Sequence, residues 1–184
     1  MKTLVIVLIV VALVVLFFVS MYNRMVRLNV NVDEGFSQIE VQLKRRSDLI
    51  PNLVETVKGY AAHESATFEK VVAARARATT ATTVADVAAA DGMITQALRG
   101  LLAVAEAYPD LKASTNFLAL QEELSTTENK VSFARQYYND NVRALNSAVK
   151  TIPMSLFAGM ANVTAREFYV VDDPQSRQAP NVKF

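Results

Sequence analysis

The sequence predicts an all-α protein, in which an N-terminal transmembrane helix is followed by an antiparallel bundle of three long helices and one short helix. An unbroken apolar run opens the chain. Later stretches repeat apolar residues at alternating steps of three and four, the spacing of one helix face. Glycine and proline number only five each among 184 residues, a composition that favours helices over sheets. We expect residues 1–27 to form the anchor, 28–171 the bundle and 172–184 an extended tail.

The composition argues against several kinds of site. A net charge of +1 provides no overall field for nucleic acid, and the absence of cysteine excludes disulfides and thiolate chemistry. The single histidine, His63, excludes a histidine-rich metal site and a bundle with two Glu-x-x-His motifs. The five glycines are scattered singly, so no phosphate-binding loop is predicted. We therefore expect a protein that is not an enzyme, uses no cofactor and binds no nucleic acid.

The N-terminal apolar run has the length of a membrane span. Leu4 to Val19 are all apolar, and the run extends to Tyr22. Its 19 residues cover about 28 Å as a helix, close to the ~30 Å of a bilayer's hydrocarbon core. A cleaved signal peptide would end in a small-x-small site, which the run does not supply, and a buried core helix is rarely so uniformly apolar. A single transmembrane helix fits best, with Tyr22 at the interface and the lipid bilayer as a partner.

Two orientations remain open for this helix in the cell (inner) membrane. Lys2 flanks one end, and Arg24 and Arg27 flank the other, so the positive charges are nearly balanced. Counting the run Lys44–Arg46 would place the bundle in the cytoplasm. A short basic N-terminus before an apolar run instead resembles an uncleaved signal anchor, which places the bundle outside the cytoplasm, and we favour this second orientation.

An amphipathic stretch, residues 32–64, organises the rest of the chain. Its apolar stripe consists of Leu28, Val32, Phe36, Ile39, Leu43, Ile50, Leu53, Val57 and Tyr60. The stripe has one longer gap, and Arg46 occupies the position in it where the period requires a core residue. We expect one helix from Met25 to Ala78, with a first flexible point near Gly35. Pro51 predicts either a kink near residues 47–50 or a helix restarted there with Ser47 or Asp48 as its cap.

Three further helices are predicted. Residues 79–83 (TTATT) break the period, and Thr83 with Asp86 suggests an N-terminal cap for a helix that ends at Tyr108–Pro109. Small residues of this helix, Ala85, Ala88 to Ala90 and Ala97, allow a neighbouring helix to approach closely. The next helix starts at Ser114 or Thr115 and keeps its alternation as far as Ile152, a pattern suited to bundle packing. A short helix follows at residues 155–162, and the polar tail ends in Phe184, which is apolar enough to dock.

Polar residues on or beside the stripes are the candidate interaction residues. The candidates are Arg46, Pro51, Asn52, Glu64, Glu128, Asn129, Arg135 and Phe184. Buried polar groups in bundles hydrogen-bond across helices and fix their register, which is the interpretation we favour; an ion or ligand site inside the bundle is the alternative. Arg46 has candidate partners in Glu128 and Asn129. His63 is expected on the surface or at the seam near Glu64.

Three blocks of this sequence stand out in order: NVDEGFSQIEVQLKRRSDLIPNLVETVKGYAAHE, LLAVAEAYPDLKASTNFLALQEELSTTENKVSFARQYYNDNV and the terminal PNVKF. The first is similar to the signature block of the LemA family, and the other two resemble later segments of that family, in the same order. The resemblance implies an N-terminal transmembrane helix followed by an antiparallel helical bundle, and it implies almost no chemistry. One departure is Ser47, where the family usually has an aromatic residue.

Two functions from different classes fit these observations. The favoured one is a single-pass membrane protein whose bundle forms homo-oligomers or scaffolds other membrane proteins. The alternative is a membrane-tethered binding or sensing module that recognises a ligand or peptide through a bundle groove or through the tail.

Overall fold

The structure is a computed structural model that describes residues 1–171. Within these residues the chain forms helices and no strand, which confirms the all-α class. The helices, in chain order, are α1 (Lys2–Lys58), α2 (Ser65–Thr80), α3 (Val84–Glu106), α4 (Pro109–Lys112), α5 (Thr115–Lys150) and α6 (Ser155–Met160). The tail predicted for residues 172–184, with Phe184, lies outside the described residues.

The chain divides into two compact units, each with its own helix packing. The N-terminal unit consists of Met1–Gln38 and Ala134–Phe168, and the bundle unit consists of Ile39–Phe133 together with residues 169–171. Helices α1 and α5 contribute to both units.

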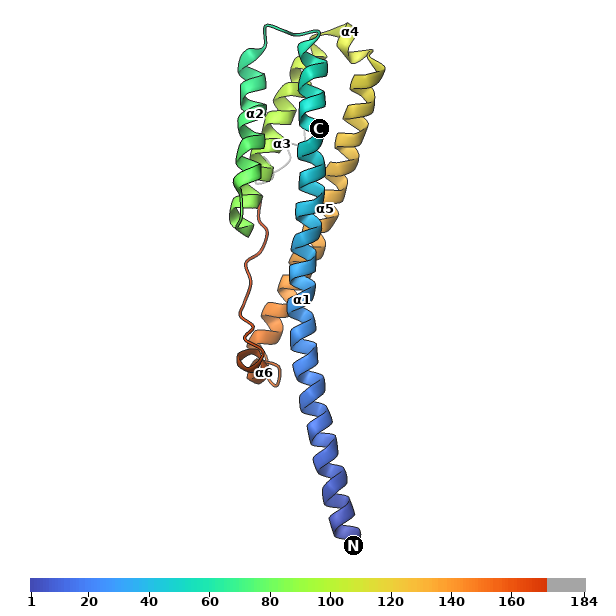
Figure 1. The fold of residues 1–184 in the computed structure, drawn as a ribbon, viewed down its shortest axis with the longest axis vertical. Helices are drawn as coiled ribbons and strands as arrows, with labels where there is room; N and C mark the ends of the chain where they lie inside the picture. The colour runs from blue at the N-terminus through green and yellow to red at the C-terminus, as the bar shows by residue number, and fades with distance from the viewer. Residues whose placement is uncertain (172–184) are drawn as a thin grey trace, which may run out of the picture. The chain divides into compact units, whose positions relative to one another are not determined.

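The bundle unit holds one continuous apolar core. Helices α2 and α3 lie side by side, next to the second half of α1 and the first half of α5 (Figure 1). Each helix contributes the apolar positions that its period predicts. The core residues are Ile50, Leu53, Val54, Val57, Ala61, Phe68, Val71, Ala74, Ile94, Leu98, Leu101, Ala105, Leu111, Phe117 and Leu124. Burial of these side chains is the main source of the unit's stability.

The expectation of one helix from Met25 to Ala78 is wrong. Helix α1 ends at Lys58, and a turn over residues 59–64 precedes α2. Gly59 begins this turn, and glycine is among the weakest helix formers. Ala61 is buried inside the turn and fixes it to the core, while Tyr60, expected on the stripe, and His63 are exposed. The turn lets α2 fold back and bury Phe68 against α1.

Several predicted helix ends are confirmed. The Thr83 hydroxyl accepts a hydrogen bond from the Asp86 backbone N–H at 3.1 Å and caps α3. Pro109 occupies the first turn of α4, where its missing N–H is tolerated, and α5 begins at Thr115 as expected. The short helix predicted after Pro153 is α6. Asn162 ends it with φ 50°, a left-handed conformation that asparagine tolerates.

In the N-terminal unit, Gly35 allows α1 and α5 to approach closely. Gly35 is buried, and a Cβ added to it would lie 3.1 Å from the Tyr138 Cα. The Phe36 ring also contacts the Tyr138 ring, with 5.8 Å between the centroids. The expected flexible point at Gly35 is therefore replaced by a tight helix contact, because α1 continues through it unbroken.

Residues 1–20 contain the start of α1 and most of the apolar segment. All of them are exposed, and the most apolar 18-residue window of α1 is 0% buried. By length and composition two helices of the described residues could cross a membrane, α1 and α3. In α3, 39% of the window is buried, and the buried side chains of Ile94, Leu98, Leu101 and Ala105 belong to the core. The long apolar segment at the N-terminus therefore suggests a membrane anchor or a signal sequence.

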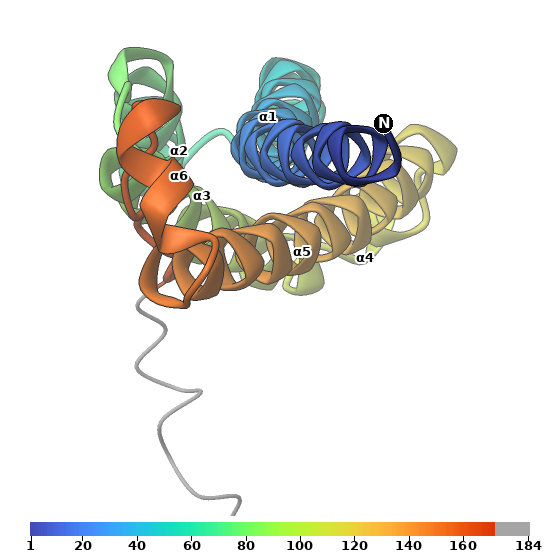
Figure 2. The same cartoon turned by 90° about the horizontal axis from the view of Figure 1, so that it is seen from below.

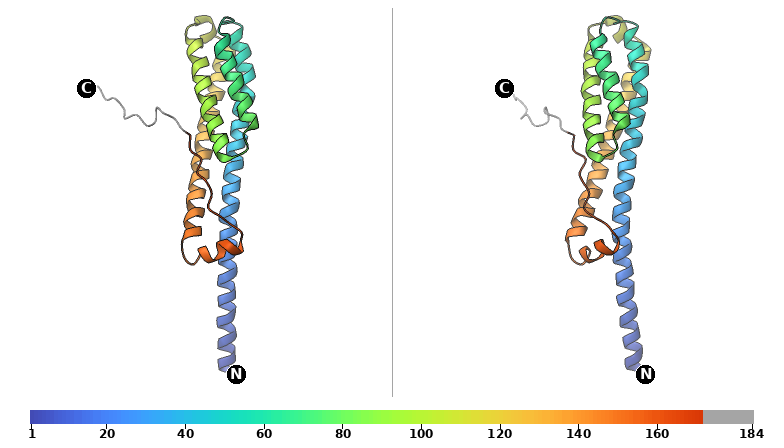
Figure 3. Two further views of the ribbon diagram at one scale, coloured as in Figure 1. Left: turned by 90° about the vertical axis from the view of Figure 1, so that its left-hand side faces the viewer. Right: turned by 60° about the vertical axis from the view of Figure 1, so that its left-hand side comes forward.

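An extended segment follows α6 and returns along α5. In Figure 2, α6 lies across the end of α5, and Figure 3 shows the chain leaving α6 in extended form. The Asn146 side chain accepts from the Arg166 N–H at 2.8 Å and donates to the Arg166 carbonyl at 2.9 Å. The Tyr138 hydroxyl donates to the Glu167 carbonyl at 2.8 Å, and burial raises the pKa of this phenol. Arg166 also forms an ion pair with Asp33.

Candidate functional site

The bundle unit contains a buried ion pair between α1 and α3. The Arg46 side chain is 5% exposed and the Asp91 side chain 1%, and Arg46 Nη1 lies 3.1 Å from Asp91 Oδ1. Both residues occupy stripe positions that the helix period assigns to the core, so packing of the apolar neighbours brings them together. Removal of both charges from water is compensated only by their contact with each other and with further polar groups.

Three more groups complete this cluster. Glu128 on α5 forms a second ion pair with Arg46 Nη2, and the Thr95 hydroxyl accepts from Nη1 at 3.0 Å. The Tyr169 hydroxyl, from the extended segment, donates to Asp91 Oδ2 at 3.1 Å. One guanidinium thus joins carboxylates from two other helices, and Asp91 links the extended segment to the same network.

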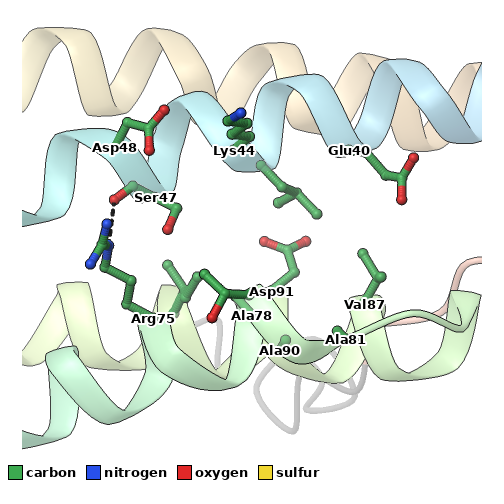
Figure 4. A pocket seen from close by; sticks show the side chains of 13 residues that line it. Glu40, Lys44, Ser47, Asp48, Arg75, Ala78, Ala81, Val87, Ala90 and Asp91 are labelled. Carbon is green, nitrogen blue, oxygen red and sulfur yellow. Dashed lines mark hydrogen bonds between the residues drawn. The ribbon is translucent and has the colours of Figure 1, made fainter.

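The cluster separates two clefts of the bundle unit. The first has a volume of about 330 Å³ and is lined by α1, α2 and α3. Its walls are apolar at Leu43 and Ile94, and the Asp91 carboxylate points into it (Figure 4). The second, of about 280 Å³, is lined by Arg46, Arg99 and Glu128 among others. Asp91 lines only the first cleft and Arg46 only the second, so the ion pair lies between them.

Ser47 at the first cleft has a backbone carbonyl that α1 itself leaves without a partner. Helix α1 continues through Pro51 without a break, so the prediction of a restarted helix capped by Ser47 or Asp48 is wrong. Pro51 has no N–H to donate to the carbonyl four residues earlier. That carbonyl, of Ser47, accepts instead from Arg75 Nε on α2 at 3.2 Å (Figure 4). The kink at Pro51 stays a prediction.

The structure brings together only part of the predicted site. Arg46 and Glu128 meet as expected, whereas Asn129 is exposed on α5. Arg135 is partly buried in the N-terminal unit, and Asn52 is exposed. Glu64 is partly buried in the turn before α2, where its side chain makes no capping hydrogen bond.

Sequence reasoning missed Asp91, Arg75 and Tyr169. A signal existed for Asp91, because it stands where the α3 stripe between Val87 and Ile94 requires an apolar residue, as Arg46 does in α1. Arg75 carries no signal of its own, since its partner is a carbonyl released by a proline on another helix. Tyr169 lies in an extended segment without a period.

The chemistry that these groups offer is mainly electrostatic. Arg46 Nε is buried and has no hydrogen-bond acceptor among residues 1–171. No three side chains of the metal-binding types lie together in that same part of the chain. The arrangement can fix the register of α1, α3 and α5, and it could hold a polar ligand at either cleft.

Comparison with protein-family models assigns most of the chain to a known family. The model of the LemA family matches residues 35–184, most of the chain after the apolar segment. No curated protein matches the chain.

Proposed function

The chain belongs to the LemA family, and we propose that it is a non-enzymatic, single-pass membrane protein whose helical bundle assembles with further copies or scaffolds other membrane proteins. Its place would be the cell (inner) membrane, with the bundle on the extracytoplasmic side. Many copies anchored in one plane would form a patch or ring, a geometry through which the protein would influence membrane organisation.

The exposed apolar segment of α1 is the observation that carries this proposal. Its side chains are unburied from residue 1 to 20, and a surface of this kind is stable only in lipid or against another protein. The same helix continues without a break to Lys58 and supplies core residues such as Leu53 to the bundle unit.

Small exposed residues on α3 support the assembly of several copies. Ala88 and Ala90 are buried in the bundle unit, whereas Ala85, Ala89, Gly100 and Ala103 are exposed, with the exposed Met93 and Gln96 between the two pairs. Nothing lies within 4 Å of a Cβ placed on Gly100. The small side chains near each end of α3 let a second helix approach closely there, which favours contact with another copy.

The Arg46 cluster supports a structural role for the polar core. Its two carboxylates and one guanidinium are engaged with one another, as in bundles where buried polar groups fix register. This interpretation assigns the cluster no catalytic step.

The particle mass of the full chain, purified in mild detergent at micromolar concentration, tests the proposal. We expect a multimer, and we expect Ala103→Arg, at one of the exposed small residues of α3, to reduce its mass. Ala119→Arg, on an exposed position of α5, is the matched control and should leave the mass unchanged. A monomer in the unmodified protein, with no partner recovered on crosslinking, would contradict the proposal.

The second candidate function is a membrane-tethered binding or sensing module. The first cleft favours it, because a buried carboxylate, Asp91, faces a largely apolar space of about 330 Å³. Native mass spectrometry of the purified protein should then show an added small-molecule mass that Ser47→Phe removes by filling the cleft. Identical bare masses for both proteins would count against this alternative.

A further inference from the structure

The outer face of α6 is apolar and exposed. Leu156 and Met160 are each 69% exposed, and Ile152, just before α6, is 83% exposed. The opposite face is buried through Met154, Phe157 and the following Ala158. Side chains this large are rarely left in water as a group, so the face is expected to have a partner.

The chain around α6 contains no charge. From Thr151 to Ala165 there is no Asp, Glu, Lys or Arg. Lys150 precedes this stretch in the last turn of α5, where a long side chain can extend its charge towards water. The next charge, Arg166, pairs with Asp33, which lies fifteen residues, or about 22 Å, beyond Phe18 on α1. Charges in this part of the N-terminal unit therefore begin where the apolar segment of α1 has ended.

Phe157 fixes the level of α6 along α1. Its ring meets the Phe18 ring edge-on, with 5.4 Å between centroids, and both residues belong to the N-terminal unit. Phe18 lies inside the apolar run, four residues, or about 6 Å, before Tyr22. Amphipathic helices at membrane surfaces bury their apolar faces by about 5–10 Å, so the level of α6 matches that of an interfacial helix.

We infer that α6 and Ile152 form a second membrane contact, lying in the interfacial layer of the bilayer beside the anchor. The occupant of the exposed face is lipid, because the Phe18–Phe157 contact places α6 beside the apolar segment of α1, which the proposed anchor puts in the bilayer. The inference rests on the proposed anchor and adds to it an element more than 130 residues away in the sequence. The end of the N-terminal unit would thus be held at the membrane by two segments.

Single-cysteine variants of the full chain test this inference, since the natural sequence has no cysteine. Each cysteine is labelled with the fluorophore NBD, and the protein is reconstituted into phosphatidylcholine–phosphatidylglycerol vesicles. A nitroxide on carbon 5 of a phosphatidylcholine acyl chain is the quencher. Leu156→Cys and Met160→Cys report on α6, Val10→Cys on the anchor, and Val30→Cys is the control. Val30 is exposed, apolar and about 18 Å beyond Phe18 on α1.

We expect quenching at positions 156 and 160 of at least half that at position 10, and little at position 30. Quenching at 156 and 160 no greater than at 30, with position 10 strongly quenched, would overturn the inference and leave the anchor in place. No quenching at position 10 would overturn the anchor and this inference together.

Discussion

Replacing Arg46 by methionine removes the cation of the buried cluster and retains most of its apolar volume. The Asp91 carboxylate, 1% exposed, then loses its ion pair with Arg46, whereas Glu128, 40% exposed, can turn to water. The loss of one partner from a buried ion pair typically costs about 3–5 kcal/mol, and Asp91 accounts for most of that cost here. We expect the free energy of unfolding of the bundle unit to fall by this amount.

Urea unfolding of the full chain in mild detergent, followed by circular dichroism, measures the effect. Arg45→Met is a matched control on the neighbouring residue, because the Arg45–Glu123 pair is exposed and should contribute about 0–1 kcal/mol. Replacing Asp91 by leucine in the Arg46→Met protein should recover at least half of the lost stability, since no uncompensated buried charge remains. If Arg46→Met costs no more than Arg45→Met, the buried cluster does not stabilise the bundle unit.

Three further predictions concern α1 and its contacts. Gly35→Ala places a Cβ against the Tyr138 backbone and should destabilise the protein by about 1–3 kcal/mol in urea unfolding. Gly100→Ala is the control, because nothing lies within 4 Å of the added Cβ, and it should stabilise the protein by up to about 1 kcal/mol. Burial raises the pKa of the Tyr138 phenol in the folded protein above its unfolded value of about 10. The neutral phenol therefore contributes its full stability below about pH 10, and this contribution is lost as the pH rises through the folded-state pKa. Tyr138→Phe should reduce this alkaline loss of stability in a pH series of unfolding curves. Arg75→Ala should lower the free energy of unfolding by about 1 kcal/mol, because the Ser47 carbonyl loses its donor. The loss should be smaller in a Pro51→Ala protein, since the N–H of residue 51 can then donate to that carbonyl, and a double-mutant cycle measures the difference.

Each of these has a distinct contrary outcome. Equal effects of alanine at positions 35 and 100 would show that Gly35 is not required for the close approach of α1 and α5. An unchanged alkaline profile in Tyr138→Phe would assign the pH dependence to other groups. Additive costs for Arg75 and Pro51 would show that Arg75 does not compensate for the proline.

The sequence predicted the helices and the apolar faces well, because their period reflects burial directly. It could not reveal the turn after Lys58. The steps of three and four continue across the turn at Val57, Ala61, Glu64 and Phe68. Because the apolar spacing does not change there, the pattern alone does not indicate a turn. Gly59 was the only local sign, and one glycine is tolerated inside a helix.

The sequence predicted Arg46 and Glu128 of the buried cluster but not Asp91 and Tyr169. Arg46 stood out as a charged residue on an apolar stripe, and Glu128 lay on a predicted seam. Asp91 occupies an equivalent step of α3, but pairing it with Arg46 requires the register between two helices, which a single sequence does not specify. Tyr169 joins the cluster through an extended segment whose path depends on tertiary contacts alone.

The proposal of a membrane-anchored assembly is tested most directly by projection images of the full chain purified in mild detergent. The proposal predicts particles that contain several copies of the bundle, with the detergent gathered on one side where the α1 segments emerge. Particles that contain a single bundle, at a concentration where the protein is fully helical, would contradict it.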